Sequence, residues 1–120
     1  MTERIVQRRW RDYRTAAGKR PVKEFILNLS DEDRAEVSIA MGEVRLEGLS
    51  AARHLKGDIY EVRATGAQKE FRILFATEGK LSQVLLSLEA FSKKTRKTPP
   101  PKIELAEQRL TDWRRRSRKV

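Results

Sequence analysis

The sequence of 120 residues contains no cysteine and a single histidine, His54. Without cysteine the chain cannot form a disulfide, a thiolate nucleophile or a cysteine-based zinc site, and one histidine cannot supply a histidine-rich metal cluster. We therefore expect no metal and no other cofactor, although carboxylate-bound magnesium stays open. The glycines lie too far apart to form a phosphate-cradling loop, so the sequence has no nucleotide-binding fingerprint.

Long apolar runs are missing too. Only 38% of the residues are hydrophobic, and no run approaches the roughly 20 apolar residues that span a bilayer. The first residues have a basic flank without the apolar segment or small-residue cleavage site of a secretion signal. These absences predict a cytoplasmic protein with no membrane partner.

Positive charge, by contrast, is abundant. The chain has 27 Lys and Arg against 17 Asp and Glu, a formal net charge of +10, which predicts a polyanionic partner, with nucleic acid ahead of a membrane surface. The last quarter, Ser92–Val120, has eleven basic and three acidic residues and ends in a basic tail at about 114–120. A chain of this length predicts one domain, residues 1–120.

The first half of the chain predicts a weak strand and two helices. The strand is expected within Ile5–Thr15, and a short helix begins at Pro21, a residue suited to a first turn because the missing N–H is not needed there. Ser30 is a typical N-cap for a second helix, which Gly48 can close. Apolar positions recur in that helix near helical spacing, at Val37, Ala40, Met41, Val44 and Leu46. We expect a helical hairpin packed on an apolar surface.

The second half changes to the two-residue period of strands. Alternating segments at Ile59–Ala64, Glu70–Thr77 and Leu81–Phe91 predict an antiparallel meander. In the third strand the core-facing residues are expected to be Val84, Leu86, Leu88 and Ala90. A cationic, proline-terminated loop, Ser92–Pro101, then ends the sheet, and a last helix is expected at about Lys102–Arg116. The fold class is α+β.

The side of the meander opposite the core is expected to be polar and mixed in charge. Its members are Glu61, Arg63, Glu70, Arg72, Ser87, Glu89 and Phe91, bordered by Lys93, Lys94, Arg96 and Lys97. Cations fixed on a sheet suit phosphodiester cleavage, because the pentacoordinate transition state carries extra negative charge. RNA supplies its own nucleophile, the 2′-hydroxyl, so such cleavage needs no metal. An ordinary interpretation is equally open, in which Arg63 with Glu70 and Glu61 with Arg72 are only cross-strand ion pairs.

The chain contains, in order, Pro21–Phe25, Leu55–Arg63, Phe71–Phe75, Phe91–Pro99 and Ile103–Ala106. In this order and spacing the segments resemble the phage-derived, HigB-like branch of the RelE/ParE toxin superfamily. The resemblance implies a RelE-like antiparallel sheet of about four strands, with an N-terminal helical hairpin packed on one face and a C-terminal helix. It also implies the toxin of a type II toxin–antitoxin system. Such a toxin is a metal-independent endoribonuclease that cleaves messenger RNA on the ribosome by 2′-hydroxyl attack, and its partner is a helix-turn-helix antitoxin.

The resemblance also assigns residues. Arg72 matches the strand arginine that contacts the scissile phosphate, Arg63 matches the basic position on the preceding strand, and Lys93 with Lys94 matches a cationic pair after the last strand. We therefore predict that Arg72, Arg63 and Lys94 are catalytic. RNA-binding roles are predicted for Lys56, Lys93, Arg96, Lys97 and Phe91.

The proton acceptor is not fixed by the sequence. Several enzymes of the superfamily have a tyrosine or histidine near the chain end, whereas no residue after Phe91 is of either type here. Lys94, Glu89, Glu61 and His54 stay candidates, and Phe91 could stack on a base. Lys94 would need neighbouring cations to lower its pKa. His54 titrates near neutrality, but a lone surface histidine is commonly incidental.

Two other functions stay open. One is a ParE-like poison of DNA gyrase, which binds its target without cutting nucleic acid. The other is a non-enzymatic nucleic-acid-binding regulatory module that uses the basic tail alone. The arginine-bearing sheet face favours the nuclease.

Overall fold

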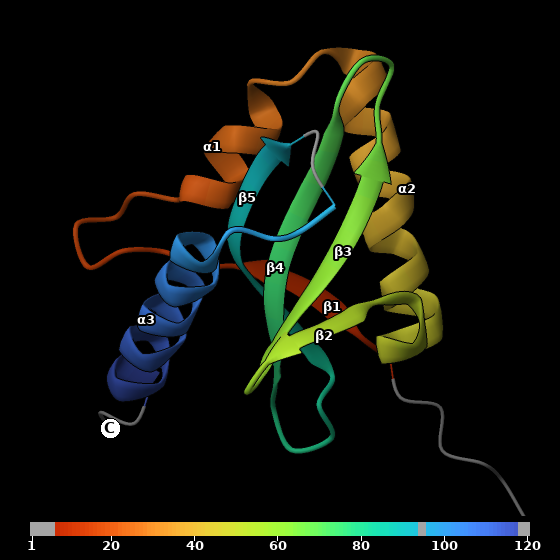
Figure 1. Cartoon of the computed structure of the whole chain (residues 1–120). Helices are drawn as coiled ribbons and strands as arrows, with labels where there is room; N and C mark the ends of the chain where they lie inside the picture. Colours follow the sequence, from red (N-terminus) through yellow and green to blue (C-terminus); the bar gives the residue numbers. More distant parts are fainter. Residues whose placement is uncertain (1–6, 94–95, 118–120) are drawn as a thin grey trace, which may run out of the picture.

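A five-stranded sheet with helices on both faces forms the protein (Figure 1). The structure is a computed structural model, and it describes residues 7–93 and 96–117. The elements are β1 (Arg9–Asp12), α1 (Pro21–Leu27), α2 (Asp31–Glu47), the 3-10 turn η1 (Gly48–Ala51), β2 (Arg53–Lys56), β3 (Ile59–Thr65), β4 (Glu70–Glu78), β5 (Val84–Lys93) and α3 (Pro100–Ser117). The strand order is β1-β5-β4-β3-β2. The α+β class is confirmed.

The prediction of about four antiparallel strands is wrong in two respects. The sheet is mixed, because β1 pairs in parallel with β5, while the other neighbours are antiparallel. It also includes β2, which the sequence did not indicate. Leu55 is the only apolar residue in Arg53–Lys56, so no alternation marks this edge strand. The tight turn that follows begins at Gly57, whose φ of 54° favours glycine.

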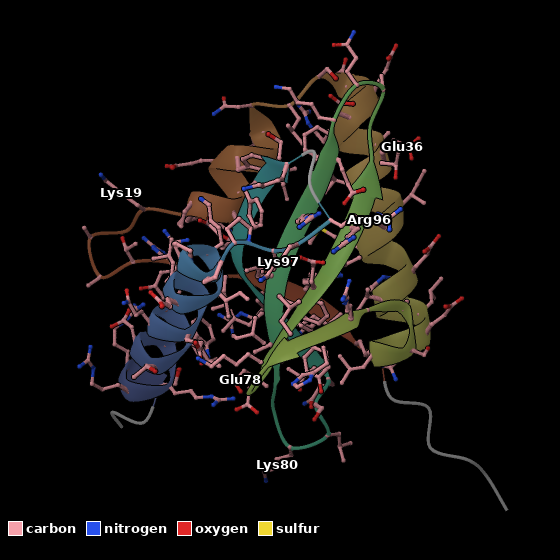
Figure 2. All side chains as sticks on the ribbon, viewed as in Figure 1. Lys19, Glu36, Glu78, Lys80, Arg96 and Lys97 are labelled. Carbon is pink, nitrogen blue, oxygen red and sulfur yellow. The ribbon has the colours of Figure 1, made fainter. Side chains whose placement is uncertain are left out.

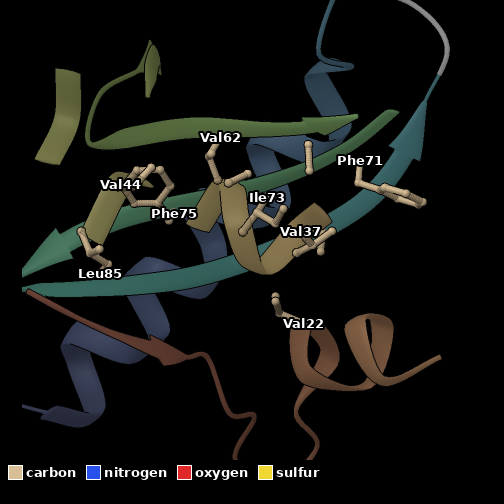
Figure 3. Close-up of a cluster of buried hydrophobic side chains, with 11 residues drawn as sticks. Val22, Val37, Val44, Val62, Phe71, Ile73, Phe75 and Leu85 are labelled. Carbon is tan, nitrogen blue, oxygen red and sulfur yellow. The ribbon is translucent and has the colours of Figure 1, made fainter. Parts of the chain in front are cut away.

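One face of the sheet is covered by α1 and α2 (Figures 1 and 3). The local signals act as predicted: Pro21 starts α1, Ser30 accepts a hydrogen bond from the Asp33 N–H at 3.1 Å, and Gly48 ends α2 with φ 77°. Each helix packs more on the sheet than on the other helix, so the expected hairpin is only approximate. The buried cluster beneath them consists of Val22, Val37, Ala40, Val44, Val62, Ala64, Phe71, Ile73, Phe75, Leu85 and Ala90.

The opposite face is covered by α3, which packs Ala106 and Leu110 against a second apolar cluster. The expected facing of β5 is therefore only partly correct, because Leu86 and Leu88 lie on the α3 side while Ala90 faces α2 and α1. A register shift opposite Leu74 and Phe75 leaves Leu88 without a partner and reverses the alternation. None of the helices in residues 7–93 and 96–117 is both long and apolar enough to cross a bilayer.

Candidate functional site

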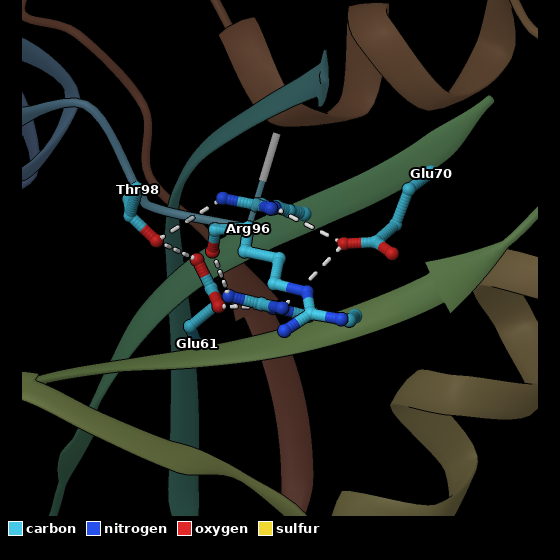
Figure 4. A network of polar contacts seen from close by, with 6 residues as sticks. Glu61, Glu70, Arg96 and Thr98 are labelled. Carbon is cyan, nitrogen blue, oxygen red and sulfur yellow. Dashed lines mark hydrogen bonds and ion pairs between the residues drawn. The ribbon is translucent and has the colours of Figure 1, made fainter. Parts of the chain in front are cut away.

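Residues 96–98, which lead into α3, cross the sheet on the same face as α3 (Figure 1). Thr98 fastens this crossing segment to the strands beneath it. Its hydroxyl donates a short hydrogen bond to a Glu61 carboxylate oxygen and accepts one from Arg72 Nη1 at 3.4 Å. The Arg96 carbonyl accepts a further hydrogen bond from Arg63 Nη2 at 2.6 Å. Residues 96–98 are therefore held against β3 and β4 by polar contacts (Figure 4).

The structure brings Arg63 and Arg72 together, directly opposite each other on β3 and β4. Both contact the same Glu70 oxygen, Arg72 Nε at 3.3 Å and Arg63 Nη1 at 3.8 Å, and Arg63 Nε lies 2.7 Å from Glu61 Oε1. The cross-strand pair of Arg63 with Glu70 expected from spacing is thus present.

The two arginines differ in their access to solvent. Arg72 is 0% exposed, whereas the Arg63 side chain is 30% exposed. Direct contact of Arg72 with a phosphate, as predicted, does not fit this burial, because Arg72 lies beneath Thr98 of the crossing segment and contacts Glu70. Arg63 is the member of the pair that a phosphate can reach.

Beside Arg63 lies a cavity of about 170 Å³ that we call the cationic pocket. Its lining residues are Arg53, Leu55, Arg63, Arg96, Lys97, Thr98 and Ile103, so four cations and no carboxylate face it. Among the described residues, Arg53, Arg96 and Lys97 form no ion pair. Cations held without a counter-charge attract anions most strongly. Sequence reasoning missed Arg53 because it missed β2; its position two residues before Leu55 would have placed it on this face.

The other predicted RNA-binding residues lie elsewhere. Lys56 pairs with Glu107 of α3 at 3.6 Å and does not line the pocket. Lys93 ends β5 opposite Glu70, and Lys94 lies outside the described residues. Phe91 is buried in the α3-side cluster with the Lys102 ammonium 5.3 Å from its ring centre. Because α3 covers Phe91, the ring has little surface for stacking on a base.

The predicted proton acceptors are engaged in contacts of their own. Glu61 is buried beneath Thr98 and Arg63. Glu89 is buried under α3, where Lys102 Nζ and Arg109 Nη1 lie 3.0 and 3.3 Å from its oxygens. His54 packs against Tyr60 and donates from Nε2 to the Gly57 carbonyl at 2.7 Å. It points to the α2 side, since neighbouring residues of a strand face opposite ways, so it does not join the pocket. Ser87, expected on the polar face, is buried and donates to the Arg11 carbonyl of β1.

The arginines at the end of α3 anchor that helix. Arg114 contacts Asp58 at 2.9 Å and Glu78 at 3.1 Å, and the hydrogen bonds that Arg114 donates to Glu78 are the main cause of its raised pKa. Arg115 and Arg116 pair with Asp112, whose pKa is lowered to about 2, first by the Tyr13 hydroxyl and then by Arg116. The described part of the tail is therefore largely neutralised by carboxylates. No group of three or more metal-ligating side chains occurs in the described ranges.

Known proteins resemble the chain in sequence. Residues 24–111 match the family described as phage-derived Gp49-like proteins. Proteins named probable endoribonuclease HigB1 from two strains of Mycobacterium tuberculosis are 37% identical to the chain over 110 residues, which cover 88% of this chain and 85% of theirs.

Proposed function

Because this chain belongs to the family of phage-derived Gp49-like proteins, we propose that it is the toxin of a type II toxin–antitoxin system and an endoribonuclease that cleaves messenger RNA. The name of its Mycobacterium tuberculosis relatives supports this activity. The observation that carries the proposal is the cationic pocket, where four basic side chains from β2, β3 and the crossing segment meet without a lining carboxylate.

The pocket suits a phosphodiester of RNA. In the reaction the ribose 2′-oxygen loses its proton and attacks the adjacent phosphorus, and the 5′-oxygen leaves with a proton, so that a 2′,3′-cyclic phosphate remains. Arg63 and Arg53 neutralise the charge that builds on the phosphoryl oxygens, and Arg96 and Lys97 hold the neighbouring backbone. This step needs no metal. Arg72 supports the site from below through Glu70 and Thr98.

The ribosome completes the site in this proposal. Among the described residues neither a carboxylate nor an imidazole lines the pocket, so proton removal depends on Lys94 or on groups that the ribosome provides. A bound ribosome would also align the 2′-hydroxyl with the phosphorus, which is worth several orders of magnitude in rate. The protein then acts in the cytoplasm, and its partner is an antitoxin, by family resemblance one of the helix-turn-helix type.

The test maps messenger RNA ends in a translating extract with purified variants. Arg53→Ala and Lys97→Ala remove cations that have no partner in the described structure, so the fold should persist while cleavage falls about tenfold or more. Lys80→Ala is the matched control, because this exposed lysine lies in the distant β4–β5 turn (Figure 2). Equal cleavage by the wild type, Arg53→Ala, Lys97→Ala and Lys80→Ala would overturn the assignment of the pocket. Inhibition of gyrase supercoiling without RNA cleavage would replace the proposed activity by the gyrase poison.

A further inference from the structure

The outer face of α2 carries an apolar row that nothing in the described structure covers. Leu46 was expected in the core, yet it is 70% exposed, and Ile39 is 57% exposed. With Ala35 and Gly42 they recur at intervals of four, three and four residues along α2. This is the heptad spacing of a helix that packs along another helix. The inner row, Val37 and Val44, already faces the sheet on the opposite side of α2.

Gly42 lies in the middle of the outer row, and as a glycine it lowers the stability of this helix. A glycine inside a helix is less favourable than alanine by about 1 kcal/mol. Packing within the chain does not require it, because a Cβ built at Gly42 meets no atom within 4 Å. A missing side chain at this point would instead allow a second helix to approach α2 closely.

A row of acidic residues runs beside the apolar row. Glu32, Glu36, Glu43 and Glu47 are all exposed, and Glu36 projects away from the molecule in Figure 2. None of the four forms an ion pair within residues 7–93 and 96–117. In a chain of formal charge +10, this is a local negative surface, which attracts a cationic partner.

We propose that the outer face of α2 is a docking site for a basic amphipathic helix of the antitoxin. The apolar row receives the apolar residues of that helix, Gly42 marks the closest approach, and Glu36 and Glu43 pair with its lysines or arginines. A second copy of this chain fits poorly, because in an antiparallel pair of α2 helices the two acidic rows would face each other. The identity of the partner as an antitoxin rests on the proposed function.

This docking site is separate from the cationic pocket. The helix α2 covers one face of the sheet, whereas the crossing segment and α3 lie on the other (Figure 1). A helix bound along α2 therefore leaves Arg53, Arg63 and Lys97 uncovered. Variants of the docking site should retain RNA cleavage, so a failure of this inference is distinguishable from a failure of the proposed function.

The first experiment measures binding of the full chain to a fluorescent helical peptide of about three heptads, with leucines at the heptad spacing and lysines beside them. Glu43→Lys should weaken binding at least about threefold and should favour a peptide whose lysines are replaced by glutamates. The matched control, Glu104→Lys, reverses an exposed and unpaired charge on α3 and should change neither affinity.

Gly42→Gln separates docking from folding. The substitution should raise the melting temperature, because glutamine favours a helix and the site has room for a side chain. It should also weaken binding about tenfold, because the side chain blocks the close approach. The second probe is the protein encoded by the neighbouring reading frame. Its affinity for this chain should also fall when the chain carries Glu43→Lys or Gly42→Gln.

Three outcomes would overturn the inference. The first is equal binding of the lysine peptide to the wild type, Glu43→Lys and Gly42→Gln. The second is an unchanged affinity of the neighbouring gene product for the two variants. The third is a wild-type dimer that Gly42→Gln dissociates, because the occupant would then be a second copy.

Discussion

Thr98→Val should uncouple the crossing segment from the sheet. Thr98 is 6% exposed, and its hydroxyl both donates to the Glu61 carboxylate and accepts from Arg72 Nη1. Valine keeps the shape of the side chain and removes both hydrogen bonds. The buried Glu61 carboxylate then loses the Thr98 donor and keeps its hydrogen bond from Arg63.

The magnitude follows from the burial of the groups left behind. A buried acceptor that loses its donor costs about 1–3 kcal/mol, and more when it is charged. We therefore expect the free energy of unfolding to fall by about 2 kcal/mol, which for a domain of this size lowers the melting temperature by about 8 °C. Thr98→Ser keeps the hydroxyl and should restore most of this loss.

The same substitution should lower RNA cleavage. Thr98 lines the cationic pocket next to Lys97 in the chain, and its hydroxyl holds this segment on the sheet. Without these hydrogen bonds the backbone that positions Arg96 and Lys97 is no longer fixed. Urea unfolding and end mapping in a translating extract, both at a temperature where the variant stays folded, measure the two effects. If Thr98→Val matches the wild type in stability and in cleavage, the crossing segment is not held as described. If it loses stability alone, the segment does not position the pocket.

Three further predictions concern the pocket and the attachment of α3. Lys97→Ala should reduce the slope of log affinity for single-stranded RNA against log salt by about 0.7, measured by fluorescence anisotropy, whereas an unchanged slope would show that Lys97 contacts no phosphate. Tyr13→Phe removes the largest cause of the lowered Asp112 pKa. Because the folded pKa of about 2 lies below the ordinary 3.8, this stabilisation is present above pH 3.8 and is lost as the pH falls. The urea midpoints of wild type and Tyr13→Phe should therefore converge between pH 4 and pH 2, and a constant gap would contradict the role of the hydrogen bond. Leu110→Ala should lower the free energy of unfolding by about 3 kcal/mol in urea titrations, and a loss below about 1 kcal/mol would mean that α3 packs loosely.

Local signals in the sequence were sufficient for most elements. Pro21, Ser30 and Gly48 act within one turn of the chain, and the alternation in β3 and β4 reflects the pleat itself. The edge strand β2 was not predicted, because a strand with one apolar residue shows no alternation of apolar and polar residues. The parallel pairing of β1 with β5 joins distant segments, and periodicity does not report the direction of pairing.

The candidate site was harder to predict for a different reason. Alternation correctly placed Arg63 and Arg72 on one face, but it does not reveal what lies above that face. Because residues 96–98 cross it, Arg72 became a buried support and Arg63 stayed accessible. Phe91 and Glu89 were covered by α3 in the same way, and Arg53 joined the pocket through a strand that was not predicted.

Because β1 pairs in parallel with β5, the sheet of a nascent chain can be completed only late in synthesis. Strand β1 leaves the exit tunnel first but gains its hydrogen-bonded neighbour only after β5 has emerged, near the opposite end of the polypeptide. Closing so large a loop is slow compared with forming a local hairpin. A truncated translation product that stops before β5 therefore has neither a completed sheet nor the crossing segment, so it lacks Arg96, Lys97 and Thr98, which line the cationic pocket.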